Sequence, residues 1–442
     1  MKVNKKSIVA ALIGHVLERY DVALYGYFSA MLAPIFFSTE NTSAALLASL
    51  GAFAAGYLMR PLGGIIFGYF GDRYGRKKAF TWSIVLVIIP TFIIGVLPSY
   101  AQIGIAAPII LITCRLMQGL CNGGEFSGAG IFVGEHTPAN RVGFTGSLIC
   151  ATGLLGAAFG TLFGAIVTLP MIPSWGWRIP FLVGSCLTFV SYFIRRRMIE
   201  TPVFQEVLEK KCTLKNPLKD VFRNYKFNIL NTIAIGGCGH ILVYMPTIYM
   251  NVVYATILKV PNFQILIINT GILGLWVILS PIMGYFADKV GIRQFMSAAA
   301  MIAILIAYPL FSFLEANLTL EGVIIFQLIL TVVGSAFVAP ISGLFISLFP
   351  VRERYSGVAF SITLGQALFG GTTPLISTFL TNITGDFKAP AFFMMFGGTM
   401  GCLAVIRMMQ FPVKLQEGLP HLTRNHLDSK TIKQLSLAEG LH

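Results

Sequence analysis

Long apolar runs separated by short polar turns dominate the chain. Twelve such runs can be traced, and each is near or above the roughly 20 residues that a membrane-spanning helix needs. Their approximate limits are 8–37, 45–70, 79–97, 104–134, 142–168, 178–196, 228–254, 263–286, 295–314, 320–348, 356–381 and 389–411. The pattern therefore predicts an all-α integral membrane protein with twelve transmembrane helices.

The composition strengthens this prediction. Of the 442 residues, 55% are hydrophobic and only 11% are charged, a balance that excludes a soluble domain of this size. The first run carries Glu18, Arg19 and Asp21 near its centre. Charges there are atypical of the apolar core of a signal peptide, so we expect a retained first helix.

A charged turn follows the second run and then recurs half a chain later. The two copies are Gly68-Tyr-Phe-Gly-Asp72-Arg73-Tyr-Gly75-Arg76-Lys77-Lys78 and Gly284-Tyr-Phe-Ala-Asp288-Lys289-Val-Gly291-Ile-Arg293, which lie 216 residues apart. Repeats in the same orientation indicate two similar six-helix halves related by an axis along the membrane normal. We expect halves at 1–196 and 228–411, a cytoplasmic linker at 197–227 and a short cytoplasmic tail at 412–442.

The distribution of basic residues predicts the orientation. If both termini are inside, 25 of the 32 Lys and Arg residues fall in cytoplasmic segments, and only Lys259 and Lys388 fall in outer loops. This asymmetry is the positive-inside pattern, so both termini are expected in the cytoplasm. It also accounts for the net charge of +14 without any nucleic-acid partner.

Ionisable residues at membrane depth are the candidates for function, because each needs a partner or a wet cavity. In the first helix, Glu18 and Asp21 are three residues apart, with Tyr25 on the same stripe. In the fourth, a polar stripe with spacing 3, 4, 3 should face protein or a water-filled cavity. It consists of Arg115, Gln118, Asn122 and Glu125. A structural network that locks helices together is the alternative.

The seventh helix adds a further polar group and a break. His240, Tyr244 and Tyr249 surround Pro246, which should kink the helix. A packed or interfacial role for His240 and the tyrosines is the alternative to contact with a solute.

Several classes of function are not supported by the sequence. It contains no Walker loop, no Cys or His spacing typical of a metal site and no nucleophile–base pair at usable spacing, so we predict no metal, no cofactor and no enzyme activity. A non-transporting membrane sensor is the rival class, although the linker and tail are too short for a soluble output domain.

The motifs resemble those of one family. The turn at Gly68–Lys78 is similar to the cytoplasmic loop signature of the major facilitator superfamily, and other motifs of the first half resemble its metabolite:proton symporter family, which includes proline/betaine transporters. These motifs are Glu18-Arg-Tyr-Asp21, Arg60-Pro-Leu-Gly63-Gly64, Arg115-Leu-Met-Gln118-Gly119 through Glu125, Trp175-Gly-Trp-Arg178 and Glu200-Thr-Pro. Arg19 departs from the family, where an aromatic residue is usual between the two acids.

The resemblance implies a secondary transporter of the bacterial inner membrane. We expect proton symport of a small zwitterion such as proline or glycine betaine by alternating access, with symport of a di- or tricarboxylate as the alternative. Its expected partners are the solute, protons and the lipid bilayer. The candidate residues are Glu125, Glu18 and Asp21 for proton coupling, Arg115, Gln118, Asn122, Tyr25, Tyr244, Tyr249 and His240 for the solute, and Gly68, Asp72, Arg73, Gly75, Arg76, Asp288 and Arg293 for a gating loop.

Overall fold

The computed structural model describes residues 5–37, 42–136, 141–210, 214 and 216–410. Within these residues the secondary structure is helical, and the helices assemble into twelve membrane-length spans, as predicted. The predicted tail at 412–442 lies outside the described residues.

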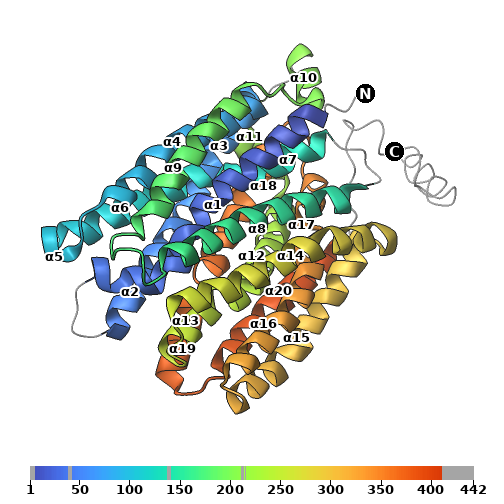
Figure 1. Ribbon diagram of the computed structural model, residues 1–442. Helices are drawn as coiled ribbons and strands as arrows, with labels where there is room; N and C mark the ends of the chain where they lie inside the picture. The colour runs from blue at the N-terminus through green and yellow to red at the C-terminus, as the bar shows by residue number, and fades with distance from the viewer. Residues whose placement is uncertain (1–4, 38–41, 137–140, 211–213, 215, 411–442) are drawn as a thin grey trace.

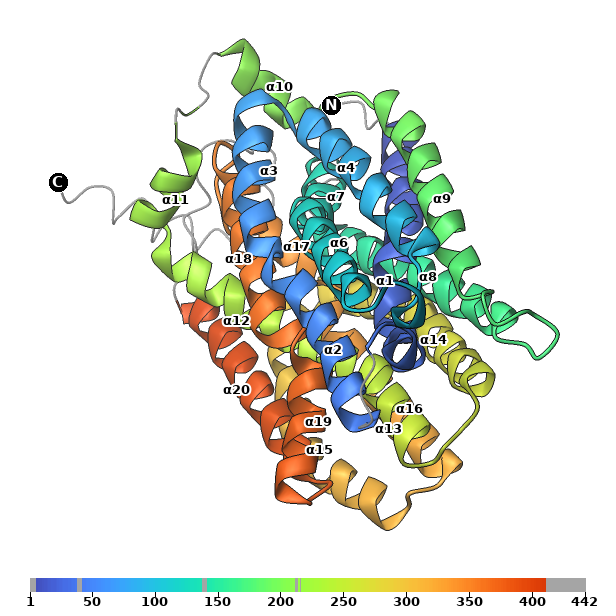
Figure 2. The ribbon, with the colours of Figure 1, turned by 90° about the vertical axis from the view of Figure 1, so that its left-hand side faces the viewer.

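Six spans come from the first half of the chain, and two of them are broken. They are α1 (Lys5–Phe36), α2 (Thr42–Leu58) with α3 (Arg60–Tyr74), α4 (Arg76–Val96), α6 (Ala106–Asn122) with α7 (Glu125–Glu135), α8 (Val142–Val167) and α9 (Arg178–Arg196). The short helix α5 (Tyr100–Ile103) precedes α6. Two further helices, α10 (Pro202–Glu209) and α11 (Pro217–Asn224), lie in the predicted linker, at the end of the bundle that carries the α3–α4 turn (Figure 2).

The second half supplies the other six spans. They are α12 (Lys226–Tyr244) with the π-helix η2 (Met245–Tyr249) and α13 (Met250–Thr256), α14 (Asn262–Val290), α15 (Ile292–Ala316), α16 (Leu320–Val338) with α17 (Ile341–Ile346), α18 (Arg354–Gly365) with the π-helix η3 (Gln366–Gly370) and α19 (Thr373–Thr384), and α20 (Ala389–Gln410). The two halves pack along their length, with α8 and α14 side by side at the boundary (Figure 1).

Eight of the described spans are long and apolar enough by themselves to cross a membrane. The four that fall short are α1, α6 with α7, α9, and α18 with α19. These spans carry polar side chains or breaks that only contact with other helices can accommodate in a bilayer.

The break in the seventh span is where Pro246 interrupts the helical hydrogen bonds. The chain forms η2 there, and neighbouring helices satisfy the backbone groups that the break frees. Gln327 Nε2 donates to the carbonyl of Pro246 at 2.6 Å, and Asn269 Nδ2 donates to the carbonyl of Thr247 at 2.8 Å. The predicted kink is therefore a π-helical turn held by side chains of α16 and α14.

Close helix packing explains part of the glycine-rich motif of the fourth span. A Cβ atom on Gly119 would lie 1.8 Å from the carbonyl oxygen of Gly56. Only a residue without a side chain lets α6 approach α2 this closely. The contact fixes α6 against the second span and so sets the direction of its polar stripe.

Candidate functional site

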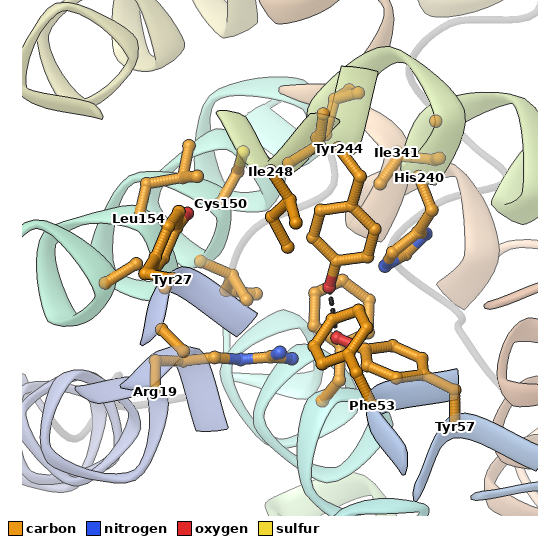
Figure 3. Close-up of a pocket in the computed structure, with 18 residues that line it drawn as sticks. Arg19, Tyr27, Phe53, Tyr57, Cys150, Leu154, His240, Tyr244, Ile248 and Ile341 are labelled. Carbon is orange, nitrogen blue, oxygen red and sulfur yellow. Dashed lines mark hydrogen bonds between the residues drawn. The ribbon is translucent and has the colours of Figure 1, made fainter. Parts of the chain in front are cut away.

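A cavity of about 100 Å³ lies between the two halves near the middle of the bundle. Its described lining is mostly apolar and aromatic, and within it Arg19 alone carries a charged side chain. The polar and aromatic lining residues are Arg19, Tyr27, Phe53, Tyr57, Phe126, Cys150, His240 and Tyr244. Figure 3 shows the labelled members of this set converging from both halves, with Arg19 and His240 directed toward the same space.

Arg19 reaches the cavity from α1. It shares one stripe of this helix with Ala23 and Tyr27, at spacing of four residues, and all three line the cavity. Its Nε donates to His15 Nε2 at 3.1 Å, and its guanidinium carbon lies 4.9 Å from the centre of the Phe126 ring. The position of Arg19 on the helix presents a positive charge to the cavity, and its contacts with His15 and Phe126 orient the guanidinium.

His15, which accepts from Arg19, is itself held by a second hydrogen bond, to Thr152. The His15 side chain is buried, and its Nδ1 lies 3.1 Å from the hydroxyl of Thr152 on α8. The Thr152 hydroxyl donates to backbone carbonyls of its own helix, and Nε2 already accepts from Arg19, so Nδ1–H is the donor to Thr152. The hydrogen bond between His15 and Thr152 therefore links α1 to α8.

Aromatic rings form the opposite part of the wall and join the halves. The hydroxyls of Tyr57 on α2 and Tyr244 on α12 share a hydrogen bond. Phe53 packs against both rings, with its centroid 4.9 Å from that of Tyr57 and 6.1 Å from that of Tyr244. The Arg60 guanidinium lies 3.5 Å from the centre of the Tyr57 ring but does not line the cavity.

Arg115 and Gln118, which were predicted to contact the solute, are part of a network inside the first half. Arg115 donates to Gln118 at 2.7 Å, Gln118 donates to the hydroxyl of Thr91 at 2.8 Å, and Thr91 donates to Asp21 Oδ2 at 2.7 Å. The Arg115 guanidinium also lies 4.5 Å from the centre of the Tyr25 ring. All five side chains are buried, and none lines the cavity.

Glu125 forms a separate buried pair. Its Oε2 lies 2.6 Å from Arg195 NH1 on α9, and Ser83 on α4 donates to its other oxygen. The side chains of Glu125 and Arg195 are both fully buried. The carboxylate thus has a cation and a hydroxyl as partners, away from the cavity lining.

The remaining predicted residues are spread over both halves. Asn122 is buried in α6 outside the cavity lining, and the Tyr249 hydroxyl bonds to that of Thr381 at 3.0 Å. His240 and Tyr244 line the cavity. Glu18 lies in α1, but its side chain is outside the described part of the structure.

The two copies of the charged turn make equivalent contacts across the boundary between the halves. Asp72, at the end of α3, accepts from the backbone N–H groups of Tyr355 and Ser356 at 3.1 and 2.7 Å, at the start of α18. Asp288, at the end of α14, accepts from those of Gly143 and Phe144 at 2.7 and 2.8 Å, at the start of α8. Each half therefore uses an aspartate to cap a helix of the other half.

Other residues of these turns complete the contact. Gly75 and Gly291 both have positive φ, at 119° and 105°, a conformation that favours glycine. Arg76 donates to Asp72 at 2.5 Å and to the carbonyl of Val351, in the other half, also at 2.5 Å.

Further groups brace the same end of the bundle. Arg354 bonds to Glu135 at 2.9 Å across the halves, and Gly68 packs so closely on α18 that a Cβ would lie 2.8 Å from Ser356 Cα. Arg73 is exposed and bonds to Tyr69, while Arg293 donates to the carbonyl of Met408 at 2.8 Å, so the hydrogen bonds of these two arginines stay within their own halves.

Comparison with known proteins places the chain in a family. Residues 13–320 match the model of the Major Facilitator Superfamily. The chain belongs to this superfamily. It is 32% identical over 426 residues to the proline/betaine transporter of Salmonella typhimurium, covering 92% of this chain and 83% of that protein. It is 30% identical to the glycine betaine/proline/ectoine/pipecolic acid transporter OusA of Dickeya dadantii, covering 97% and 88%.

A solved structure has the same fold. The proton:xylose symporter XylE, bound to 6-bromo-6-deoxy-D-glucose, superposes with a TM-score of 0.72 at 17% identity, covering 92% of this chain and 95% of that one. Together these comparisons confirm the predicted fold and the resemblance to proline/betaine transporters. The protein is a multi-pass membrane protein and a solute transporter rather than an enzyme.

Several cavity residues were missing from the predicted set. Arg19 had been noted as a departure from the family, and Tyr27, Phe53, Tyr57 and Phe126 had not been selected. A signal for the first helix was available in the spacing of Arg19, Ala23 and Tyr27, which defines a stripe distinct from that of Glu18, Asp21 and Tyr25. For the aromatic residues, the sequence offers only rings in apolar spans, which are far more often packing residues.

Proposed function

We propose that this protein is a proton-coupled symporter of a small zwitterion of the proline or glycine betaine kind. The observation that carries the proposal is the pairing of the Arg19 guanidinium with aromatic rings around one cavity. A guanidinium binds a carboxylate through charge-assisted hydrogen bonds, and aromatic faces attract an ammonium group. The names of the relatives point to the same class of solute.

A di- or tricarboxylate is a less favoured solute. It requires at least two cations, and Arg115 with Arg19 or Arg60 are the candidates within the spans. Neither Arg60 nor Arg115 lines the cavity, because Arg60 lies over Tyr57 and donates to Gln366 at 3.1 Å, while Arg115 belongs to the network that ends at Asp21. One guanidinium facing aromatic rings suits one carboxylate and one ammonium group.

Asp21 is the carboxylate that we propose carries the proton. Its side chain is buried, Oδ2 accepts from Thr91, and Oδ1 has no hydrogen-bond partner in the described part of the structure. Among the described residues, the hydrogen bonds that link it to a cation run through Thr91 and Gln118 to Arg115. Glu125, the first candidate from the sequence, has Arg195 in direct contact instead, which favours a permanent ion pair.

Movement of the solute requires the cavity to open to each side in turn. We infer that the halves rock about the cavity and that the capping contacts of Asp72 and Asp288 break when the end that carries them opens. The distribution of basic residues supports assigning this end, and both termini, to the cytoplasm of a bacterial cell.

Uptake into proteoliposomes under an imposed inward proton gradient tests the proposal. Labelled glycine betaine, L-proline and 2-oxoglutarate are supplied separately, with gradient-free vesicles as the control. Gradient-driven accumulation of a zwitterion supports the proposal, whereas accumulation of 2-oxoglutarate alone would establish the carboxylate alternative. If the protein binds one of these solutes but transports none of them, the result would favour a non-transporting membrane sensor.

A further inference from the structure

His240 and Tyr244 are the polar side chains that the second half of the chain contributes to the described lining of the cavity. The centroid of the His240 ring lies 6.3 Å from that of Phe126. The centre of the same Phe126 ring lies 4.9 Å from the Arg19 guanidinium carbon. Figure 3 shows the imidazole directed into the cavity beside Tyr244. A cation on α1 and an imidazole on α12 thus contact the same aromatic ring at the cavity.

A backbone hydrogen bond determines which His240 nitrogen can serve a solute. Nδ1 lies 2.8 Å from the carbonyl oxygen of Gly236, one helical turn earlier. A carbonyl oxygen only accepts, so Nδ1 carries a hydrogen and donates it. In the neutral ring, Nε2 is then an acceptor without a hydrogen. A proton on Nε2 would add a second positive charge to a cavity that Arg19 already lines, at a high desolvation cost.

Because His240 Nε2 can accept a hydrogen bond but not donate one, it can distinguish zwitterions that have an N–H group from those that have none. L-Proline carries two N–H groups on its ammonium, whereas a betaine carries N-methyl groups and no N–H. We propose that His240 Nε2 accepts a hydrogen bond from the ammonium N–H of the solute and thereby makes the site selective for N–H zwitterions over fully N-methylated ones. This inference rests on the proposed function and adds to it the part of the solute that each half binds.

The tyrosine hydroxyls of the cavity are less selective. Those of Tyr57 and Tyr244 are already bonded to each other, and a hydroxyl can both donate and accept, so either one can turn to suit different solutes. The imidazole lacks this freedom because Gly236 fixes its tautomer and its packing against Phe126 and Tyr244 fixes its plane.

The test compares two solutes that share one ring and differ only in N-methylation, L-proline and its N,N-dimethyl derivative. Dissociation constants are measured for both with purified wild-type protein, His240→Leu and His240→Gln. Leucine removes the acceptor, whereas the glutamine amide oxygen can occupy the position of Nε2. We expect His240→Leu to weaken proline binding about tenfold while dimethylproline binding changes less than about twofold, and His240→Gln to retain most of the proline affinity.

The outcomes separate this inference from the proposed function. Parallel weakening of both solutes by His240→Leu would mean a packing role for His240 and would overturn the inference alone. Unchanged binding of both would overturn it as well. If the wild type binds neither solute and accumulates neither these nor glycine betaine under a proton gradient, both the inference and the proposed zwitterion transport are wrong.

Discussion

Replacing Glu125 by glutamine distinguishes a structural ion pair from a proton carrier. The change keeps the size of the side chain and the hydrogen bond from Ser83 but removes the charge opposite Arg195. Because both side chains of the pair are fully buried, Arg195 is left with no carboxylate in contact among the described residues. We therefore expect Glu125→Gln to lower the free energy of unfolding.

The size of the loss follows from the surroundings of Arg195. Removing one partner of a buried pair costs about 3–5 kcal/mol. Here the guanidinium keeps two favourable contacts, a hydrogen bond to the carbonyl of Phe80 at 2.8 Å and a position 3.6 Å from the centre of the Phe80 ring. The lower end of the range, about 3 kcal/mol, is therefore expected.

Denaturant unfolding of the purified protein measures this loss. Wild type, Glu125→Gln, Arg195→Met and the double variant form a cycle, and the double variant should recover most of the stability because no unpaired charge remains. Stability of Glu125→Gln within about 0.5 kcal/mol of wild type, together with loss of gradient-driven accumulation, would refute the structural interpretation and identify Glu125 as the proton carrier.

Three further predictions concern the proton carrier and the gating end. Asp21→Asn should abolish proton-driven accumulation but leave solute exchange across the membrane intact; retained accumulation would exclude Asp21 as the carrier. Asp72→Asn, with Asp288→Asn as its symmetric counterpart, should leave the protein folded but reduce transport at least about tenfold, since a neutral amide interacts less favourably with a helix N-terminus; uptake at the wild-type rate would show that these capping contacts do not control opening. Glu353 lies outside the spans, and burial together with the nearby carboxylates of Asp72 and Asp220 raises its pKa from 4.5 to about 7. Its contribution to stability is therefore complete below about pH 4.5 and is lost as the pH rises through about 7, so the fall in melting temperature between pH 5 and pH 8 should be smaller in Glu353→Gln; an equal fall in both proteins would contradict this.

The fold was predictable because its signals are local and repeated. The apolar runs indicate twelve helices, and the recurring turn indicates two halves. The structure adds that Asp72 and Asp288 cap helices of opposite halves. No local pattern contains that information, because the partners lie 283 and 145 residues away.

The lining of the cavity was harder to predict, and α1 shows why. Both Arg19 and Asp21 are charged residues near the middle of the helix, and both define plausible stripes. Which stripe faces the cavity depends on how α1 packs against α8 and α9, and the sequence does not specify that packing. Arg115 shows the same difficulty, because spacing gives its stripe but not its buried partners Gln118 and Tyr25.

Binding of labelled L-proline to purified wild type and Arg19→Gln tests the central claim most directly. Arg407→Gln is the matched control, because Arg407 is exposed at the end of α20 and stacks on Phe227. If Arg19 binds the solute carboxylate, its replacement should weaken binding at least about a hundredfold, the equivalent of about 3 kcal/mol for charge-assisted hydrogen bonds, while the control binds as the wild type does. Equal affinity of all three proteins would contradict the assignment of this cavity as the zwitterion site.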